Sequence, residues 1–150
     1  MKKNKKFILT VILPLLIIVV ASFFIAIKSR TYSATDVLTN ANFNAANPTV
    51  TVHRVNIGYK DIFTDIKLPK ETQKELIESF KNAKFEKASV SLLDYDYRIN
   101  FTLNTGYAIF LDSHNKSLTV ISTKEDYRIS NDSNFFTILK KTTQSKVLTI

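Results

Sequence analysis

An uninterrupted apolar segment near the amino terminus, Phe7–Ile27, constrains this chain more than any other feature. It holds 21 residues without a charged side chain, and basic residues flank it on both sides. As a helix that rises about 1.5 Å per residue, it would extend roughly 31 Å, the hydrocarbon thickness of a bilayer. The sequence therefore predicts a transmembrane helix over residues 7–27, with the lipid bilayer as its partner.

The basic flanks predict the direction in which this helix crosses the membrane. Four lysines lie in residues 1–6, whereas only Lys28 and Arg30 follow the segment closely. Because the more basic flank stays in the cytoplasm, we expect residues 1–6 inside and the carboxy-terminal part outside, as in a signal-anchor protein of the cell membrane. The alternative is a cleaved signal peptide and a secreted product, since Val19-Val20-Ala21 and Tyr32-Ser33-Ala34 offer small residues for cleavage.

The charge of the remaining chain argues against nucleic acid as a partner. The formal net charge is +8, but six of the 21 basic residues lie in residues 1–30 and all 13 acidic residues follow Arg30. Residues 31–150 therefore carry 15 basic and 13 acidic side chains, a net charge of only +2. A nearly balanced domain lacks the basic stripe that phosphate neutralisation requires.

Beyond the membrane segment the pattern predicts a polar tether over 28–49 and one α+β domain over 50–150. The tether is small and polar, with isolated apolar residues and no helical or strand period. Residues 50–59 are rich in β-branched side chains and predict a strand, and residues 62–68 predict a second extended piece. Pro69 suits the first turn of a helix over 69–84, because its missing N–H needs no partner there.

The second half of the domain predicts an antiparallel meander and a final helix. We expect strands over 88–92, 97–103, 107–111, 118–123 and 127–130, and an apolar helix around 135–139 that begins at Asp132 or Ser133. Gly106 is expected to supply the left-handed position of a hairpin loop. We expect residues 145–150 to form a frayed tail or a short edge strand.

The order of these elements resembles that of known folds. A long helix followed by an antiparallel meander resembles the element order of cystatin-like and NTF2-like folds, although a fold alone implies no function. The segments Tyr97-Arg98-Ile99 and Tyr127-Arg128-Ile129, with the Gly106 hairpin and Phe135-Phe136, also resemble those of uncharacterised small anchored or secreted proteins of Gram-positive bacteria. This resemblance covers about residues 50–140.

The meander carries apolar residues on both faces, which raises the question of what covers the second one. Ala108, Phe110 and Ile121 point away from the dominant apolar face, whereas a solvated face should be polar there. We expect the helix around 135–139 to cover these side chains. If that helix packs elsewhere, Ala108, Phe110 and Ile121 become candidates for an interaction patch.

The residues that could carry chemistry form no catalytic constellation. Asp94 and Asp96 flank a turn and are weak candidates for a divalent metal, and a small metal-dependent hydrolase is the enzymatic alternative that they leave open. The run Asp112-Ser113-His114 holds three triad residue types, but neighbours in one loop cannot relay protons in the required geometry, so we interpret it as a turn. The chain has no cysteine, two histidines and two glycines, which excludes thiolate metal sites and a glycine-rich phosphate loop. No cofactor is expected.

Together these observations predict a single-pass, membrane-anchored, extracytoplasmic binding module without catalytic activity. Its expected partners are the bilayer and an envelope protein. The alternatives are a secreted domain that acts on an external partner and the small hydrolase.

Overall fold

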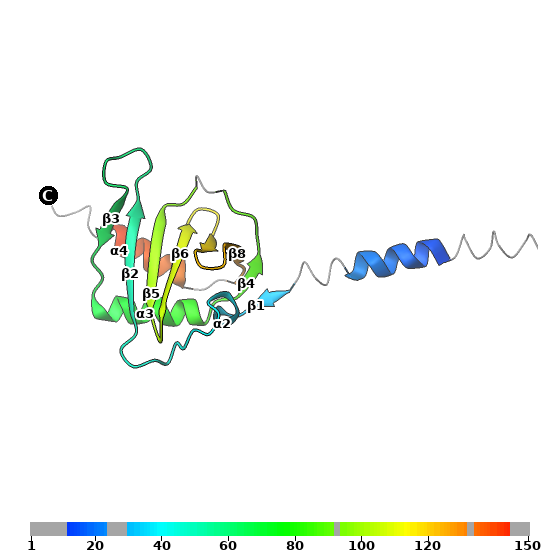
Figure 1. Cartoon of the computed structure of the whole chain (residues 1–150), viewed down its shortest axis with the longest axis horizontal. Coiled ribbons are helices and arrows are strands. Elements are labelled where there is room, and N and C mark those ends of the chain that lie inside the picture. The colour runs from blue at the N-terminus through cyan, green and yellow to red at the C-terminus, as the bar shows by residue number, and fades with distance from the viewer. Residues whose placement is uncertain (1–11, 24–29, 92–93, 132–133, 145–150) are drawn as a thin grey trace, which may run out of the picture. The chain divides into compact units, whose positions relative to one another are not determined.

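The computed structural model describes residues 12–23, 30–91, 94–131 and 134–144 (Figure 1). The chain divides into two compact units, Met1–Arg30 and Thr31–Ile150, and each is considered by itself. In the first unit residues 12–23 are helical. Over the part of the chain that the structure describes, no helix has the length and apolar character needed to span a bilayer. The rest of the predicted span, 7–11 and 24–27, lies outside the described residues.

The second unit is an α+β fold built on one eight-stranded antiparallel sheet. The strands are β1 (Thr31–Tyr32), β2 (Thr49–Val55), β3 (Phe63–Ile66), β4 (Phe85–Lys87), β5 (Tyr97–Thr102), β6 (Gly106–Asp112), β7 (Ser117–Val120) and β8 (Glu125–Ile129). The helices are α2 (Ala34–Val37), α3 (Lys70–Lys81) and α4 (Phe135–Gln144). The strand order is β1-β4-β8-β7-β6-β5-β2-β3, so β1 and β3 form opposite edges of the sheet.

The predicted meander is confirmed in β5 to β8, which pair consecutively. Ile99 of β5 lies opposite Ile109 of β6, and Ile109 lies opposite Val120 of β7. Because side chains alternate between faces along a strand, these residues share one face with Val52 of β2. This face of the sheet contains the buried core and is called the helix face, because the helices pack on it. The opposite face is called the open face.

Helix α3 follows the sequence prediction closely. Pro69 precedes its first residue with a φ of −57°, and Asn82 ends it. The apolar stripe of Leu76, Ile77 and Phe80 is buried, as its helical spacing predicted. The ring centroid of Phe80 lies 4.8 Å from that of Phe101 on β5, so this stripe packs on the helix face of the sheet.

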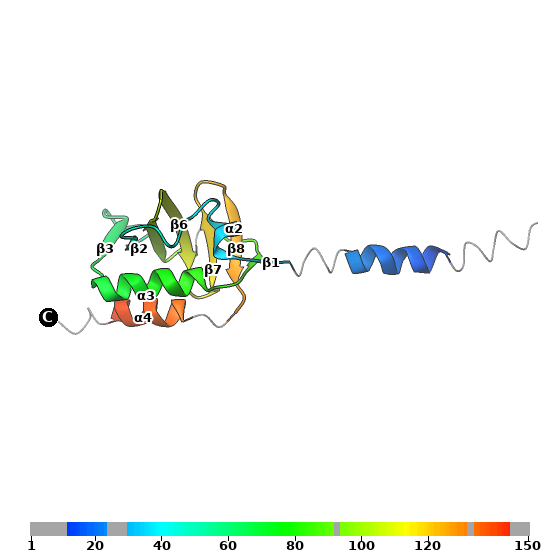
Figure 2. The ribbon, with the colours of Figure 1, turned by 90° about the horizontal axis from the view of Figure 1, so that it is seen from below.

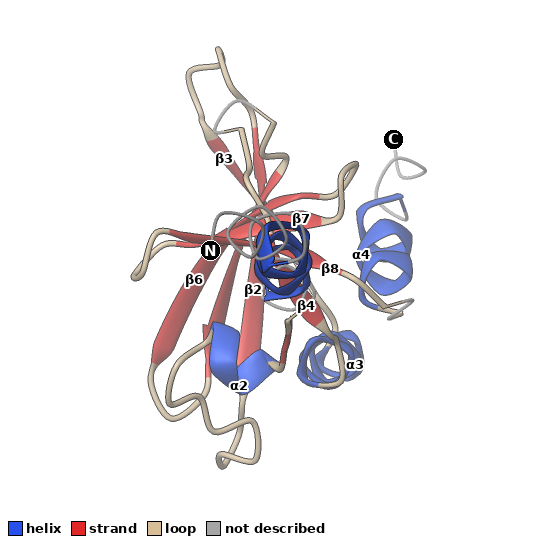
Figure 3. Ribbon diagram, turned by 90° about the vertical axis from the view of Figure 1, so that its right-hand side faces the viewer, coloured by secondary structure: helices blue, strands red, loops and turns tan. Residues whose placement is uncertain are grey.

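Helix α4 also lies on the helix face, which contradicts our expectation that it would cover the open face. Figures 2 and 3 show α3 and α4 next to each other on one side of the sheet. Phe135 of α4 is fully buried, and its ring centroid lies 5.5 Å from that of Phe80 on α3. Both helices have one apolar side, and burying the two sides together on the same core removes both from water.

The predicted tether over 28–49 is wrong for residues 31–49, which belong to the folded unit. Thr31 and Tyr32 of β1 pair with β4, and α2 follows with Ser33 as its N-cap. Ser33 and Asp36 form a capping box: the Asp36 N–H donates to Ser33 Oγ, and the Ser33 N–H donates to Asp36 Oδ2 at 2.8 Å. The apolar side chains of this segment are buried in the core, namely Ala34, Val37, Leu38, Ala41 and Phe43.

Three local predictions also differ from the structure. The strand predicted over 50–59 ends at Val55, because the chain turns through Gly58, whose φ of +90° favours glycine. Gly106 has no positive φ and begins β6, so it is not the left-handed residue of its loop. The strand predicted over 88–92 is replaced by β4 at Phe85–Lys87. Residues 92–93, the predicted helix start at 132–133 and the predicted tail at 145–150 lie outside the described residues.

Candidate functional site

The predicted patch of Ala108, Phe110 and Ile121 lies on the open face, but an aromatic ring covers part of it. Ala108 and Phe110 are alternate residues of β6, and the Ile121 N–H donates to the Ala108 carbonyl at 3.0 Å, so the structure brings the three together. The Tyr95 ring stacks on Phe110 with centroids 5.2 Å apart and an interplanar angle of 20°. Phe110 is therefore shielded by the β4–β5 connection rather than by α4.

Polar contacts hold Tyr95 in this position. Its hydroxyl forms a hydrogen bond with the Thr119 hydroxyl, which donates to Asp126 Oδ1 at 2.5 Å. Burial raises the pKa of the Tyr95 hydroxyl, while the hydrogen bond with Thr119 works against this rise. The second oxygen of Asp126 accepts the Val90 N–H at 3.2 Å, which attaches the start of the same connection to β8. This arrangement explains Phe110 as the base of a packed loop, whereas Ile121 of the same patch stays exposed.

The weak metal candidates Asp94 and Asp96 form separate local hydrogen bonds. Asp96 accepts hydrogen bonds from both the backbone N–H (2.9 Å) and the hydroxyl of Ser113. The Asp94 N–H donates to the Ser91 carbonyl at 3.2 Å, which is a turn contact. Within the described ranges, no three His, Cys, Asp or Glu side chains are close enough together to hold a metal ion.

The Asp112-Ser113-His114 run forms a turn, as the sequence predicted. Buried Asp112 accepts the Asn115 N–H at 2.9 Å and its side-chain amide at 2.7 Å, which is typical of an aspartate that stabilises a turn. Ser113 and His114 line a pocket of about 580 Å³ with Asp96. The Ser113 hydroxyl donates to Asp96, however, and not to His114, so this pocket lacks the pairing of nucleophile and base that acyl transfer requires.

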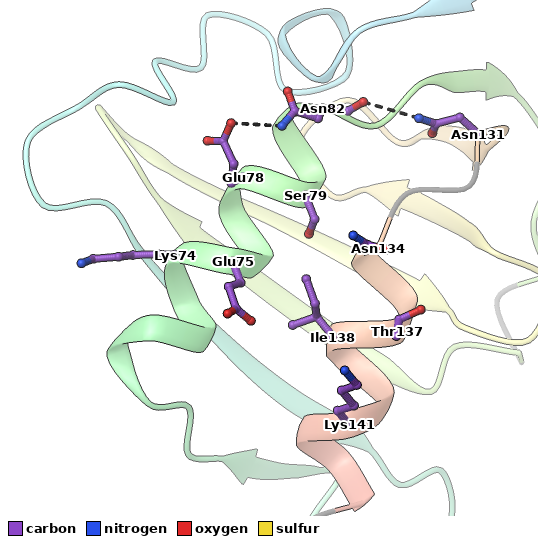
Figure 4. A pocket seen from close by; sticks show the side chains of 10 residues that line it. All are labelled: Lys74, Glu75, Glu78, Ser79, Asn82, Asn131, Asn134, Thr137, Ile138 and Lys141. Carbon is purple, nitrogen blue, oxygen red and sulfur yellow. Dashed lines mark hydrogen bonds between the residues drawn. The ribbon is translucent and has the colours of Figure 1, made fainter.

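A larger hollow of about 820 Å³ lies between α3 and α4 (Figure 4). Most of the residues that line it are of polar type, and they combine Glu75 and Glu78 with Lys74 and Lys141. Figure 4 shows Ile138 between the helices and Lys74 directed away from α4. Glu78 accepts the Asn82 side-chain amide at 3.0 Å, so part of the lining is already satisfied within the chain. The balanced charges are typical of a solvent-facing groove between two packed helices.

The exposed apolar surface of the second unit is concentrated on the β2–β3 hairpin. Among its described residues, five large hydrophobic side chains are 36% exposed or more. One is Ile121, and the other four belong to this hairpin. They are Ile57 (57% exposed), Tyr59 (75%), Ile62 (54%) and Phe63 (40%). An exposed apolar cluster of this kind is typical of an interaction site. The sequence pattern did not predict this cluster, although the glycine within Asn56-Ile57-Gly58-Tyr59 was a turn signal.

Polar residues surround the open-face side of this hairpin. His53 Nδ1 lies 2.7 Å from Asp65 Oδ1, and His53 Nε2 lies 3.1 Å from the Asn100 amide nitrogen. The Arg98 guanidinium lies over the Phe63 ring at 5.4 Å, in the geometry of a cation–π contact. Arg98 Nε is buried without a hydrogen-bond partner in the described part of the chain.

A second charged cluster, near the β1 edge, is structural in character. Lys87 Nζ lies 2.7 Å from Glu125 Oε1 and 3.0 Å from the Tyr127 hydroxyl, above the Tyr127 ring. The hydrogen bond from Lys87 lowers the pKa of Glu125. Burial acts to lower the pKa of Lys87, but the hydrogen bonds with Glu125 and Tyr127 outweigh it, so the pKa is raised. These contacts connect β4 to β8.

Comparisons with known proteins found no relative with which this geometry could be compared. No protein-family model matches the chain, and no curated protein or solved structure shows significant similarity to it. A function for this chain is therefore inferred from its own surfaces.

Proposed function

We propose that this chain is a membrane-anchored, extracytoplasmic binding module that docks a protein partner through the tip of its β2–β3 hairpin. The anchor is Phe7–Ile27, and residues 31–150 form the module. The observation that carries the proposal is the exposure of Ile57, Tyr59 and Ile62 at one end of the sheet. Keeping three large apolar side chains in water is unfavourable, at about 25 cal/mol for each Å² of apolar surface, and a partner that covers them gains this energy.

Two features favour a protein over the bilayer as the occupant of this tip. The chain enters the module at β1, while the hairpin belongs to the opposite edge of the sheet, seven strand spacings or roughly 34 Å away. The tip also carries one lysine, Lys60, next to one aspartate, Asp61. Segments that insert among anionic lipid headgroups typically carry an excess of basic residues, and this one does not.

Protease shaving of intact cells tests the anchor and its direction. With a carboxy-terminal tag, we expect a full-length, membrane-bound chain whose tag is removed by external protease. A shortened chain in the medium would instead indicate a cleaved signal peptide and a secreted module. A tag protected in intact cells but cut after lysis would contradict the proposed orientation.

Site-specific photo-crosslinking in intact cells tests the docking surface. A photoreactive residue in place of Tyr59 is expected to crosslink one discrete protein, whereas the same residue in place of the exposed Lys74 on α3 is not. The Tyr59 crosslink should disappear in an Ile62→Ser background, with the thermal unfolding temperature unchanged because Ile62 is exposed. Equal crosslinking from both positions would contradict the proposed surface.

A further inference from the structure

Strand β3 ends the sheet with an unpaired edge. It pairs with β2 on one side, and no strand of the described residues lies on its other side. A free edge presents N–H and C=O groups that can pair with another strand. Phe63, Thr64 and Asp65 are exposed, and no described residue forms a backbone hydrogen bond with the outer side of this strand.

The hydrogen bonds of the hairpin show which β3 residues face outward. The Asn56 N–H donates to the Ile62 carbonyl at 2.8 Å, so residues 56 and 62 are a hydrogen-bonded pair. In an antiparallel ladder such pairs alternate, and Arg54↔Thr64 and Val52↔Ile66 are therefore the next two. The N–H and C=O groups of Phe63 and Asp65 consequently point away from β2, into the free edge.

The outward direction of the Phe63 and Asp65 backbone groups restricts how a second copy of the chain could pair with the same edge. A two-fold, antiparallel pairing that uses these groups must be centred on Phe63, Thr64 or Asp65 if β3 is to overlap well with its partner. Centring on Phe63 places Asp61 opposite Asp65, and centring on Asp65 places Asp65 opposite itself. In both registers a carboxylate lies directly opposite another carboxylate. Centring on Thr64 instead places Asp61 opposite Lys67, twice by symmetry.

The same register also decides which residue of the second copy lies opposite Asp65, whose carboxylate contacts His53 within its own chain. It places Asp65 of one copy opposite Phe63 of the other, whose ring lies under the Arg98 guanidinium at 5.4 Å. Arg98 Nε lacks an acceptor within the described part of its own chain. Asp61 and Lys67 are both exposed, and neither forms an ion pair among the described residues. Opposite charges directly across a strand pair are favourable, and like charges are not.

We infer that two copies of this chain associate by antiparallel pairing of their β3 strands, centred on Thr64. This dimer joins two sheets into one through the backbone edge of β3. It shares Asp61 and Ile62 with the hairpin tip, but a disulfide between Thr64 positions and a crosslink from Tyr59 to another protein report on the two contacts separately. Confinement to one membrane would raise the effective concentration for a pairing as short as this one.

A disulfide test in the full-length chain in its membrane measures this register directly. The chain has no cysteine, so Thr64→Cys introduces a single thiol. Residues 64 of the two copies would form a pair without backbone hydrogen bonds, with Cα atoms about 4.5 Å apart, within the range of a disulfide. We expect mild oxidation to give a disulfide-linked dimer for Thr64→Cys. The matched control Thr102→Cys, exposed but on the inner strand β5, should remain monomeric.

Charge exchange in the Thr64→Cys background gives a second readout that does not depend on folding, because both side chains are exposed. Asp61→Lys alone or Lys67→Asp alone should lower the dimer yield roughly tenfold, since each opposes like charges twice. Co-expressing the two single variants should restore the yield, because the mixed dimer again pairs opposite charges. Equal disulfide yields for residues 64 and 102, or no restoration on mixing, would overturn the inference.

Discussion

Phe80 is the residue at which both helices and the sheet meet. Its ring centroid lies 5.1 Å from that of Phe85 on β4, besides the contacts with Phe101 and Phe135, and its side chain is fully buried. Phe80→Ala should lower the free energy of unfolding by about 3–5 kcal/mol, because several rings lose their partner and a cavity remains. Urea unfolding measures this loss, and Lys74→Ala on the exposed side of α3 is the control. A change below about 1 kcal/mol would contradict the packing of α4 on Phe80.

The Lys87–Glu125 ion pair gives a residue-scale prediction about pH. The pKa of Glu125 is lowered from 4.5 in the folded state, so its stabilisation is present above that value and is lost as the pH falls through the folded pKa. The pKa of Lys87 is raised from 10.5, so its contribution is present below that value and is lost as the pH rises through the folded pKa. The side chains are 44% and 46% exposed, and solvent screening therefore limits the coupling to at most about 1 kcal/mol.

A double-mutant cycle with Lys87→Met and Glu125→Gln measures this coupling. We expect it at neutral pH and expect it to vanish once the pH lies well below the lowered pKa of Glu125, where the carboxylate is protonated. A coupling that stays constant across this range would assign the effect to packing of the Lys87 stem on Tyr127.

At the scale of elements, regular periodicity was predictable and irregular packing was not. Tyr97–Leu103 alternates because one face of β5 is buried, and the stripe of α3 repeats at helical spacing, so both were correct to within a few residues. Val37, Leu38 and Phe43 follow no period, since their burial arises from contacts with distant elements. The stacking of Tyr95 on Phe110, which joins a loop to β6, was not predictable either, because it is also a contact between separate elements.

The β4–β5 connection makes the role of Tyr95 testable. Tyr95→Ala should expose Phe110 and lower the free energy of unfolding by about 3–5 kcal/mol, because a buried aromatic ring is lost. Tyr95→Phe keeps the ring and removes only the hydroxyl, so it should cost about 1 kcal/mol. Chemical denaturation of the two variants separates these effects. Equal losses would mean that the hydrogen bond to Thr119, rather than stacking, holds the connection in place.

At the scale of the whole molecule, recognising the candidate site required knowing where the strands end. The sequence placed Ile57 and Tyr59 within a strand, and only the turn through Gly58 reveals them as an exposed tip. The side of the sheet on which α4 packs was equally unpredictable from local pattern. An amphipathic helix requires an apolar surface, but its own sequence does not indicate which of two surfaces it covers.

The boundary of the folded unit gives the last prediction. A fragment beginning at Thr31 contains β1, α2 and the buried side chains of Val37, Leu38 and Phe43, whereas one beginning at Val50 lacks them all. Each of these side chains contributes about 1.5–3 kcal/mol on burial, and their sum approaches the total stability of a typical domain. We therefore expect residues 31–150 to unfold cooperatively and residues 50–150 to be largely unfolded, as measured by circular dichroism and amide exchange. Leu38→Ala in the longer fragment should cost about 2–5 kcal/mol, while the exposed Thr35→Ala should cost little, as a surface substitution. A stable fragment of residues 50–150 would mean that residues 31–49 are a tether after all, lying on a domain that folds without them.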